Sequence, residues 1–87
     1  MSEVYYSYIL QSLKDSRFYY GYTSDLDKRV RKHNSGGVSS TRHRLPLVLH
    51  YYEVFNSKSE ALKREKFFKS LEGRDWLIKN KIISSTK

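Results

Sequence analysis

Cysteine is absent from the 87 residues, which excludes disulfide bonds, thiolate metal sites such as zinc fingers, and a thiol nucleophile. The absence also suits the reducing cytoplasm, where we expect the protein to be located. No apolar run approaches the roughly 20 residues of a membrane span, and the N-terminal residues lack the pattern of a signal peptide. We therefore expect a soluble protein with no membrane partner.

Acidic residues are also few: nine Asp and Glu stand against 17 Lys and Arg, which gives a formal net charge of +8. This excess favours a polyanionic partner such as nucleic acid. Charge alone also fits a surface that aids solubility, an acidic protein partner or a membrane leaflet. Hydrophobic residues make up 38% of the chain, enough for the core of one domain, and that core must be rich in aromatic rings.

Two segments at residues 4–10 and 18–22 are rich in aromatic and β-branched side chains and flank a polar stretch, which predicts a β-hairpin. Thr23 or Ser24 can then cap a first helix, whose early acidic and later basic residues suit the helix dipole. The Asn-Ser-Gly-Gly run at residues 34–37 is expected to end this helix.

The polar loop at residues 36–46 is rich in hydroxyl, glycine and basic residues and is suited to holding phosphates. A third strand at residues 47–55 is expected to start after Pro46, and its weak alternation predicts that much of both faces is covered. Ser57 and Glu60 form a capping box at the start of a second helix, and apolar residues follow at helical spacing.

Gly73 is expected to interrupt the second helix, and residues 75–81 predict a short final helix. The order strand, strand, helix, strand, helix, helix indicates an α+β fold, in which helices flank a small three-stranded antiparallel sheet. We expect one domain over residues 1–83 and a frayed tail at residues 84–87.

Glu65 is the most informative charged residue, because the helical spacing of apolar residues places it inside their arc on the second helix. A carboxylate on that arc faces the body of the protein, where it must be paired or must bind a cation. Two roles therefore fit Glu65: a structural partner of a buried cation or of tyrosine hydroxyls, or a ligand of a metal ion.

Arg29 and His33 are four residues apart on the first predicted helix and therefore share a face. Together they can bind one phosphate, although Asp25, four residues before Arg29, also offers it an ordinary surface ion pair. Further basic residues of this helix and of the loop after it are candidates for nucleic-acid binding. They are Lys28, Arg31, Lys32, Arg42, His43 and Arg44.

Tyrosine recurs on both strands of the predicted hairpin, so each face of the hairpin carries phenols. Most of these residues must be structural, but cations near a phenol lower its pKa toward the value that a general base requires. No Walker loop, dinucleotide motif or paired helical histidines accompany them in the sequence. An inward carboxylate, a helical arginine, tyrosines and a positive surface are the components of single-metal phosphodiester chemistry.

The order of these residues resembles that of the small standalone members of the GIY-YIG nuclease superfamily, over nearly the whole chain. Residues 6–10 are similar to the first signature strand of the family, and residues 19–23 to the second. The chain departs from the pattern at Tyr6-Ser7, where the family has Gly-Ile, and at Tyr20, where it has Ile. The further matching positions are Asp25, Leu26, Arg29, His33, Asn34, Gly36, Thr41, Arg42, Pro46, Tyr51, Glu53, Glu60, Ala61, Arg64, Glu65 and Lys69.

The resemblance implies a set of active-site roles. It makes Tyr8 and Tyr19 the signature tyrosines and Arg29 the catalytic arginine. It makes His33 a supporting active-site residue and Glu65 the ligand of a Mg²⁺ or Mn²⁺ ion. Either tyrosine can relay a proton from the attacking water, with Tyr19 preferred narrowly and His33 as a rival.

The implied activity is hydrolysis of DNA phosphodiester bonds, with RNA as the less favoured substrate. Members of the family commonly gain target choice from attached DNA-binding domains, so we expect low sequence specificity or a partner protein that supplies it. Two other classes of protein fit the same residues. A non-catalytic module on this scaffold would bind nucleic acid without turnover, and a basic protein-interaction module would not bind nucleic acid at all.

Overall fold

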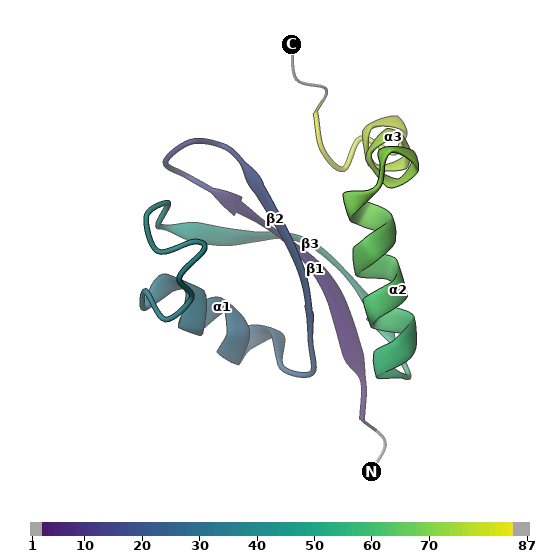
Figure 1. Ribbon diagram of the computed structural model, residues 1–87, viewed down its shortest axis with the longest axis horizontal. Helices are drawn as coiled ribbons and strands as arrows, with labels where there is room; N and C mark the ends of the chain where they lie inside the picture. Colours follow the sequence, from purple (N-terminus) through teal and green to yellow (C-terminus); the bar gives the residue numbers. More distant parts are fainter. Residues whose placement is uncertain (1–2, 85–87) are drawn as a thin grey trace.

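The computed structural model describes residues 3–84 and has the α+β fold expected from the sequence, with helices on both sides of a three-stranded antiparallel sheet (Figure 1). Its elements are β1 (Tyr5–Ser12), β2 (Phe18–Thr23), α1 (Leu26–Asn34), β3 (Leu47–Phe55), α2 (Lys58–Lys69) and α3 (Leu71–Lys79). Within the described range, no helix has the length and apolar character needed to cross a membrane. Residues 85–87 of the expected tail lie outside the described residues.

Strand β1 lies at the centre of the sheet in the order β2-β1-β3, so β2 and β3 are both edge strands. Alternation along β1 separates two hydrophobic cores, because Tyr8 points to one face of the sheet and Ile9 to the other. Helix α1 covers the Tyr8 face through Val30, whereas Phe68 of α2 and Leu77 of α3 cover the Ile9 face. Figure 1 shows the strands passing between α1 on one side and α2 with α3 on the other.

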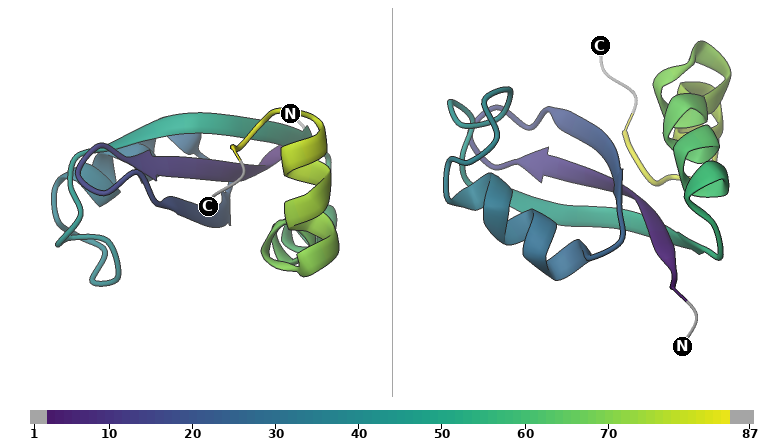
Figure 2. Two further views of the ribbon diagram at one scale, coloured as in Figure 1. Left: turned by 90° about the horizontal axis from the view of Figure 1, so that it is seen from above. Right: turned by 60° about the horizontal axis from the view of Figure 1, so that its bottom comes forward.

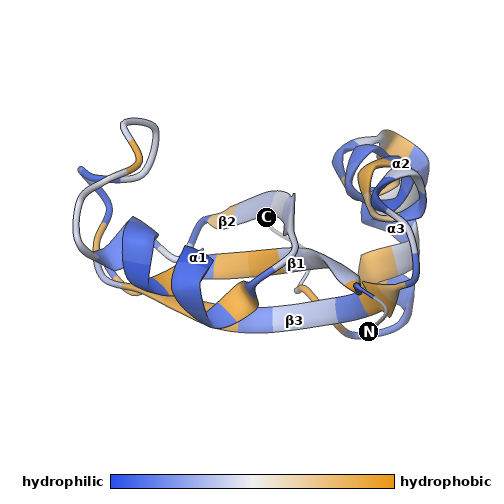
Figure 3. Ribbon diagram, turned by 90° about the horizontal axis from the view of Figure 1, so that it is seen from below, coloured by the Kyte–Doolittle hydropathy of each residue, from blue (hydrophilic) through white to orange (hydrophobic). Residues whose placement is uncertain are grey.

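Strand β3 is not covered on both faces, so this expectation was wrong. Helix α1 is short and largely hydrophilic (Figure 3), and it packs only over the start of β3, beside Leu47. The weak alternation that suggested full cover reflects a β-bulge next to Ile9 and Leu10 of β1, which leaves His50 as an extra residue in β3. The apolar side chains left between 39% and 52% exposed are Val48, Leu49, Tyr52 and Val54.

Helix α1 is capped by Asp25 and not by Thr23 or Ser24, as the sequence had suggested. The Asp25 carboxylate accepts the backbone N–H of Lys28 at 3.1 Å. The Thr23 hydroxyl instead accepts the backbone N–H of Asp25 at 3.2 Å and so holds the capping residue in place. The helix ends as expected before Gly36, whose φ of 82° favours glycine.

Helix α2 begins with the predicted capping box, in which the Ser57 hydroxyl accepts the backbone N–H of Glu60 at 3.2 Å. The break between α2 and α3 lies at Ser70 and not at Gly73. The Ser70 hydroxyl donates to the Phe67 carbonyl at 2.6 Å and accepts the Gly73 backbone N–H at 3.0 Å. Gly73 lies inside α3, where a Cβ would collide with the Phe67 carbonyl group. A close contact between helices, and not a helix break, therefore requires glycine here.

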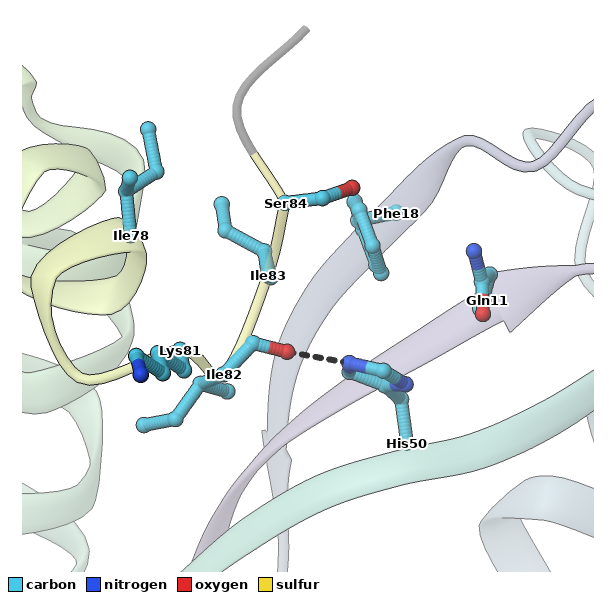
Figure 4. Close-up of a pocket in the computed structure, with 8 residues that line it drawn as sticks. All are labelled: Gln11, Phe18, His50, Ile78, Lys81, Ile82, Ile83 and Ser84. Atoms are coloured by element: carbon cyan, nitrogen blue, oxygen red, sulfur yellow. Dashed lines mark hydrogen bonds between the residues drawn. The ribbon is translucent and has the colours of Figure 1, made fainter.

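The loop at residues 35–46 and the α2-α3 pair lie at opposite ends of the sheet (Figure 2). Beyond α3 the chain turns back toward the strands, where Ile83 is 6% exposed and belongs to the core of the Ile9 face. His50 donates from Nε2 to the Ile82 carbonyl at 2.5 Å and its ring packs against Phe18 (Figure 4). The bulge residue of β3 therefore fixes the end of the described chain against the sheet.

Candidate active site

The phenol of Tyr8 lies at the centre of the site, and the sheet makes room for it. Tyr8 pairs with Gly21 of the edge strand β2, and a Cβ at Gly21 would lie 2.6 Å from Cζ of the Tyr8 ring. The ring is 3% exposed, and its hydroxyl oxygen accepts a hydrogen bond from Arg29 Nε at 3.2 Å. His33 Nε2 lies 3.4 Å from the same oxygen. Arg29 and His33 therefore share a face, as expected, and both face Tyr8.

Thr41 sets the tautomer of His33. Its hydroxyl lies 3.4 Å from the Val38 carbonyl, to which it donates, and 2.8 Å from His33 Nδ1. Because the carbonyl can only accept, the Thr41 oxygen is left to accept the Nδ1 proton of His33. Nε2 then carries a lone pair and accepts the Tyr8 hydroxyl proton. Sequence reasoning gave Thr41 no such role, because the contact joins a loop to a helix.

His33 is buried, and this burial is the main reason why its pKa is lowered from the ordinary 6.5. The nearby charges of Arg29 and Lys32 lower the pKa further. Each of these effects disfavours the imidazolium form. The imidazole is therefore neutral at neutral pH, which is the form that can accept a proton from Tyr8.

We expect the lowered pKa of His33 to make the protein less stable below pH 6.5. In that range the unfolded chain takes up a proton that the folded chain does not, so the stability present above pH 6.5 is lost as the pH falls toward the lower folded pKa. Urea unfolding at about pH 7.5 and about pH 5.5 measures this loss. His33→Gln should lose less unfolding free energy between the two pH values, and equal losses in both proteins would contradict the prediction.

Glu65 enters the site from α2, which packs on the opposite face of the sheet from α1. Its side chain is 13% exposed, as its place in the apolar arc predicts. Oε2 lies 2.9 Å from Nζ of Lys69, whose side chain is 54% exposed. The lysine end of the ion pair is therefore open to solvent, while the carboxylate is largely buried. The long Lys69 side chain can turn into solvent when another cation approaches the carboxylate.

A cavity of about 190 Å³ brings the predicted catalytic residues together, and its lining includes residues from both faces of the sheet. This volume is below the roughly 300 to 1,000 Å³ of pockets that enclose a drug-sized ligand. It suits a phosphate group and its counter-ion better than a nucleobase with its sugar. The predicted residues that line it are Tyr8, Tyr19, Arg29, His33 and Glu65. It is completed by Tyr20, Gly21, Tyr22, Val38, Ser40 and Thr41.

The donor groups of this cavity fit one weakly held divalent cation. Between residues 3 and 84, no three His, Cys, Asp or Glu side chains gather into a site that could enclose a metal ion. Mg²⁺ commonly binds through one or two carboxylates, keeps several waters and takes further oxygens from the phosphates of its substrate. Glu65 alone meets that requirement, and we expect metal affinity to be low without nucleic acid.

Arg64, next to Glu65 in α2, fixes the orientation of this helix. Its guanidinium Nε donates to Glu53 of β3 at 2.7 Å, and Nη2 donates to the second carboxylate oxygen at 3.3 Å. The same guanidinium lies 4.5 Å from the ring centroid of Trp76 in α3. Burial and the neighbouring Glu53 raise the pKa of Tyr51, which donates to that carboxylate, to about 12. The contacts of Arg64 with Glu53 and Trp76 hold α2 in the orientation in which Glu65 faces the cavity.

The basic residues predicted to bind nucleic acid fall into two groups. Lys28 and Lys32 line a second cavity, which also contains Arg29. The others lie outside both cavities, and two of them are in ion pairs: Arg31 with Asp27 at 2.7 Å, and Arg44 with Asp15 at 3.1 Å. Instead of Arg42, His43 and Arg44, the loop contributes Val38, Ser40 and Thr41 to the catalytic cavity.

The fold and this site define the chain as a catalytic domain of the GIY-YIG class, and the class suggests a nuclease. The GIY-YIG catalytic domain matches residues 4–80, and the chain belongs to that family. Within the family it is similar to the small UPF0213 proteins.

Three comparisons illustrate this similarity. A UPF0213 protein of Bacillus licheniformis is 44% identical over 72 residues, which are 82% of this chain and 73% of that protein. A UPF0213 protein of Streptococcus pyogenes serotype M3 is 49% identical over 70 residues, which are 79% of this chain and 75% of that protein. The solution NMR structure of a UPF0213 protein of Bacillus halodurans, 41% identical, matches with a TM-score of 0.54 over 90% of this chain and 85% of that chain. The names of these relatives state a family and no reaction.

Proposed function

We propose that the protein is a metal-dependent endonuclease that hydrolyses DNA phosphodiester bonds with low sequence specificity. One observation carries this proposal: Arg29, His33 and four tyrosines, Tyr8 and Tyr19 among them, meet the lone carboxylate of Glu65 in a single small cavity. A cavity of about 190 Å³ is suited to the nucleic-acid backbone, which is the same for every sequence. Membership of the GIY-YIG family supports a nuclease.

In the proposed mechanism, Tyr8 is the general base. A water oxygen bonds to phosphorus while the bond from phosphorus to one ester oxygen breaks. The Tyr8 hydroxyl gives its proton to Nε2 of His33 and takes the proton of the attacking water. Arg29, which already donates to the Tyr8 oxygen, stabilises the phenolate and the charge that develops on the phosphate. The leaving oxygen receives a proton from solvent, and His33 returns its proton to solvent, which restores the neutral imidazole.

Tyr8 is thus proposed in place of Tyr19, which the sequence favoured narrowly. The Tyr19 ring lines the cavity and lies 5.9 Å beneath the guanidinium carbon of Arg44. Its place favours a role in shaping the cavity wall. Glu65 would hold the Mg²⁺ or Mn²⁺ ion, which when bound supplies positive charge to stabilise the leaving oxygen.

The test of this function is the conversion of supercoiled plasmid to nicked and linear forms in Mg²⁺ or Mn²⁺. The wild-type protein is expected to nick the plasmid, and Glu65→Gln is expected to slow nicking by roughly 10²- to 10³-fold. Glu72→Gln is the matched control, because Glu72 is an exposed acid of α3 outside the catalytic cavity. The assignment is wrong if wild type and Glu65→Gln leave identical plasmid fractions.

A non-catalytic nucleic-acid-binding module is the second candidate, and the ion pair between Glu65 and Lys69 favours it. If Lys69 keeps the carboxylate neutralised, the cavity is a purely cationic phosphate site. Both candidates predict that affinity for duplex DNA falls with salt, with a log-log slope of about −0.9 for each phosphate bound. Only metal-dependent turnover in the plasmid assay separates them.

A further inference from the structure

Three cavities follow the edge strand β2, neighbouring ones share a lining residue, and together we call them the groove, with the catalytic cavity in its middle. Arg29 lines both this cavity and a neighbouring one of about 350 Å³, which is formed by residues 23–25 and by α1. Tyr20 lines both the catalytic cavity and another neighbour of about 470 Å³, which is formed by residues 15–18, α3 and the chain beyond it. In chain order the three hollows follow β2 from its start to its end. Figure 1 shows β2 in front, between α1 and α2.

Each end of the groove carries a pair of cationic side chains. Lys28 and Lys32, one turn apart on α1, line the cavity at the end of β2. Arg17 and Arg74 line the cavity at its start. With Arg29 in the middle, positive charge follows the whole edge of the strand.

The acidic groups that face the end cavities already have hydrogen-bond donors. Asp25 accepts the backbone N–H of Lys28 as the cap of α1. Asp15 accepts the backbone N–H of Arg17 at 3.0 Å and pairs with Arg44 at 3.1 Å. Arg44 therefore compensates the charge of Asp15, and three cations line the cavity of Asp25, so the field along the groove remains favourable for an anion.

Aromatic rings lie between these cations. Tyr20 and Tyr22 line the catalytic cavity, and Phe18 lines the cavity at the start of β2. Phe18 and Tyr20 also pack against the core of the Ile9 face, so each offers a partly exposed ring to the groove. Beyond Phe18 a further hollow of about 440 Å³ lies beside Ile83 and Ser84, where the chain runs between α3 and the strands (Figure 4). Rings alternating with cations along one groove are typical of sites for single-stranded nucleic acid, because bases stack on the rings while the cations bind phosphates.

We propose that the β2 edge binds one unpaired nucleic-acid strand, with phosphates at both ends of the groove and the scissile phosphate at its centre. This inference rests on the proposed function and names its substrate: DNA that is single-stranded, or branched with a single-stranded arm. The six residues of β2 span about 20 Å, which matches about six nucleotides at a rise of ~3.4 Å. An edge strand also leaves backbone N–H groups unpaired within the sheet, and these can donate to phosphate oxygens.

Fluorescence anisotropy of the Glu65→Gln protein in EDTA tests this binding without any turnover. The probes are a labelled mixed-sequence strand of about 12 nucleotides, twice the expected groove length, and the same strand in a duplex. The single strand is expected to bind more tightly. Tyr20→Leu should weaken single-strand binding by roughly 10-fold and change duplex binding little, as expected for the loss of base stacking. Tyr22→Leu is the second variant if thermal melting shows that Tyr20→Leu does not fold.

The salt dependence of single-strand binding maps the two ends of the groove. Each phosphate that a cation neutralises adds about 0.7 to the log-log slope, so the slope should fall by about 1.4 in Lys28→Ala/Lys32→Ala and by about 0.7 in Arg17→Ala. Lys66→Ala/Lys79→Ala is the control, because both lysines are exposed and lie outside the three cavities. Equal binding of duplex and single strand, or a control pair that lowers the slope as much as the groove pair, overturns the proposal. Failure to cleave the labelled single strand in Mg²⁺ or Mn²⁺, with these binding results intact, would reject the nuclease and retain the strand site.

Discussion

Gly21→Ala is expected to slow plasmid nicking by roughly 10²- to 10⁴-fold while the domain stays folded. The added methyl group would lie within 2.6 Å of the Tyr8 ring, so the ring must leave its place. Tyr8 would then lose its hydrogen bonds with Arg29 and His33, and with them the proton transfer proposed for the attacking water. The measurement is the rate of nicking in Mg²⁺, with circular dichroism to confirm the fold.

Tyr8→Phe distinguishes this cause from a general distortion. It keeps the ring and removes only the hydroxyl, so it should slow nicking about as much as Gly21→Ala. If both changes act through the same phenol, the double variant should be no slower than either single one. Nicking by Tyr8→Phe within a few-fold of wild type would show that the phenol is not the base.

Gly73→Ala is expected to destabilise the domain by about 3 kcal/mol, the upper end of the usual cost of overpacking. The new Cβ would lie 2.5 Å from the carbonyl carbon of Phe67 and 3.0 Å from Cα of Phe68. These atoms belong to the backbone at the end of α2, so no side-chain rotation can relieve the clash. For a domain of this size the melting temperature should fall by about 12 to 24 °C, measured by circular dichroism.

Glu72→Ala is the control for this prediction. Glu72 precedes Gly73 in α3 and is exposed, so the change adds no buried atom. Its unfolding free energy should stay within about 0.5 kcal/mol of wild type. A similar loss in both variants would mean that the close contact between α2 and α3 is not what requires glycine.

The elements of the fold were predictable because their signals are local. The capping box at Ser57 and the glycine that follows α1 act within a few residues of their own positions. The order of the strands in the sheet is set by contacts between residues far apart in the sequence. The exposure of β3 depends on that order and could not be predicted in the same way. The break at Ser70 was missed for a related reason. A glycine can end a helix or allow another helix to pack closely against it, and only the packing of α2 against α3 shows which applies to Gly73.

The residues of the candidate site were found through resemblance, and sequence spacing by itself gave less. Helical periodicity was enough to place Glu65 inward and to put Arg29 and His33 on one face. It gave no sign of the bond between Thr41 and His33, which joins a loop to a helix. A glycine within a strand does indicate close approach of another group, so Gly21 carried a signal that could have been read.

Both hydrophobic cores of this small domain contribute to the lining of the catalytic cavity, Tyr8 and Tyr19 from one face of the sheet and Tyr20 from the other. A molecule held there would bridge the two layers, so neither α1 nor α2 could come loose without releasing it. Its binding free energy would then add to the cooperativity of unfolding as a whole. A ligand in the cavity would therefore couple the unfolding of the helices on the two faces of the sheet.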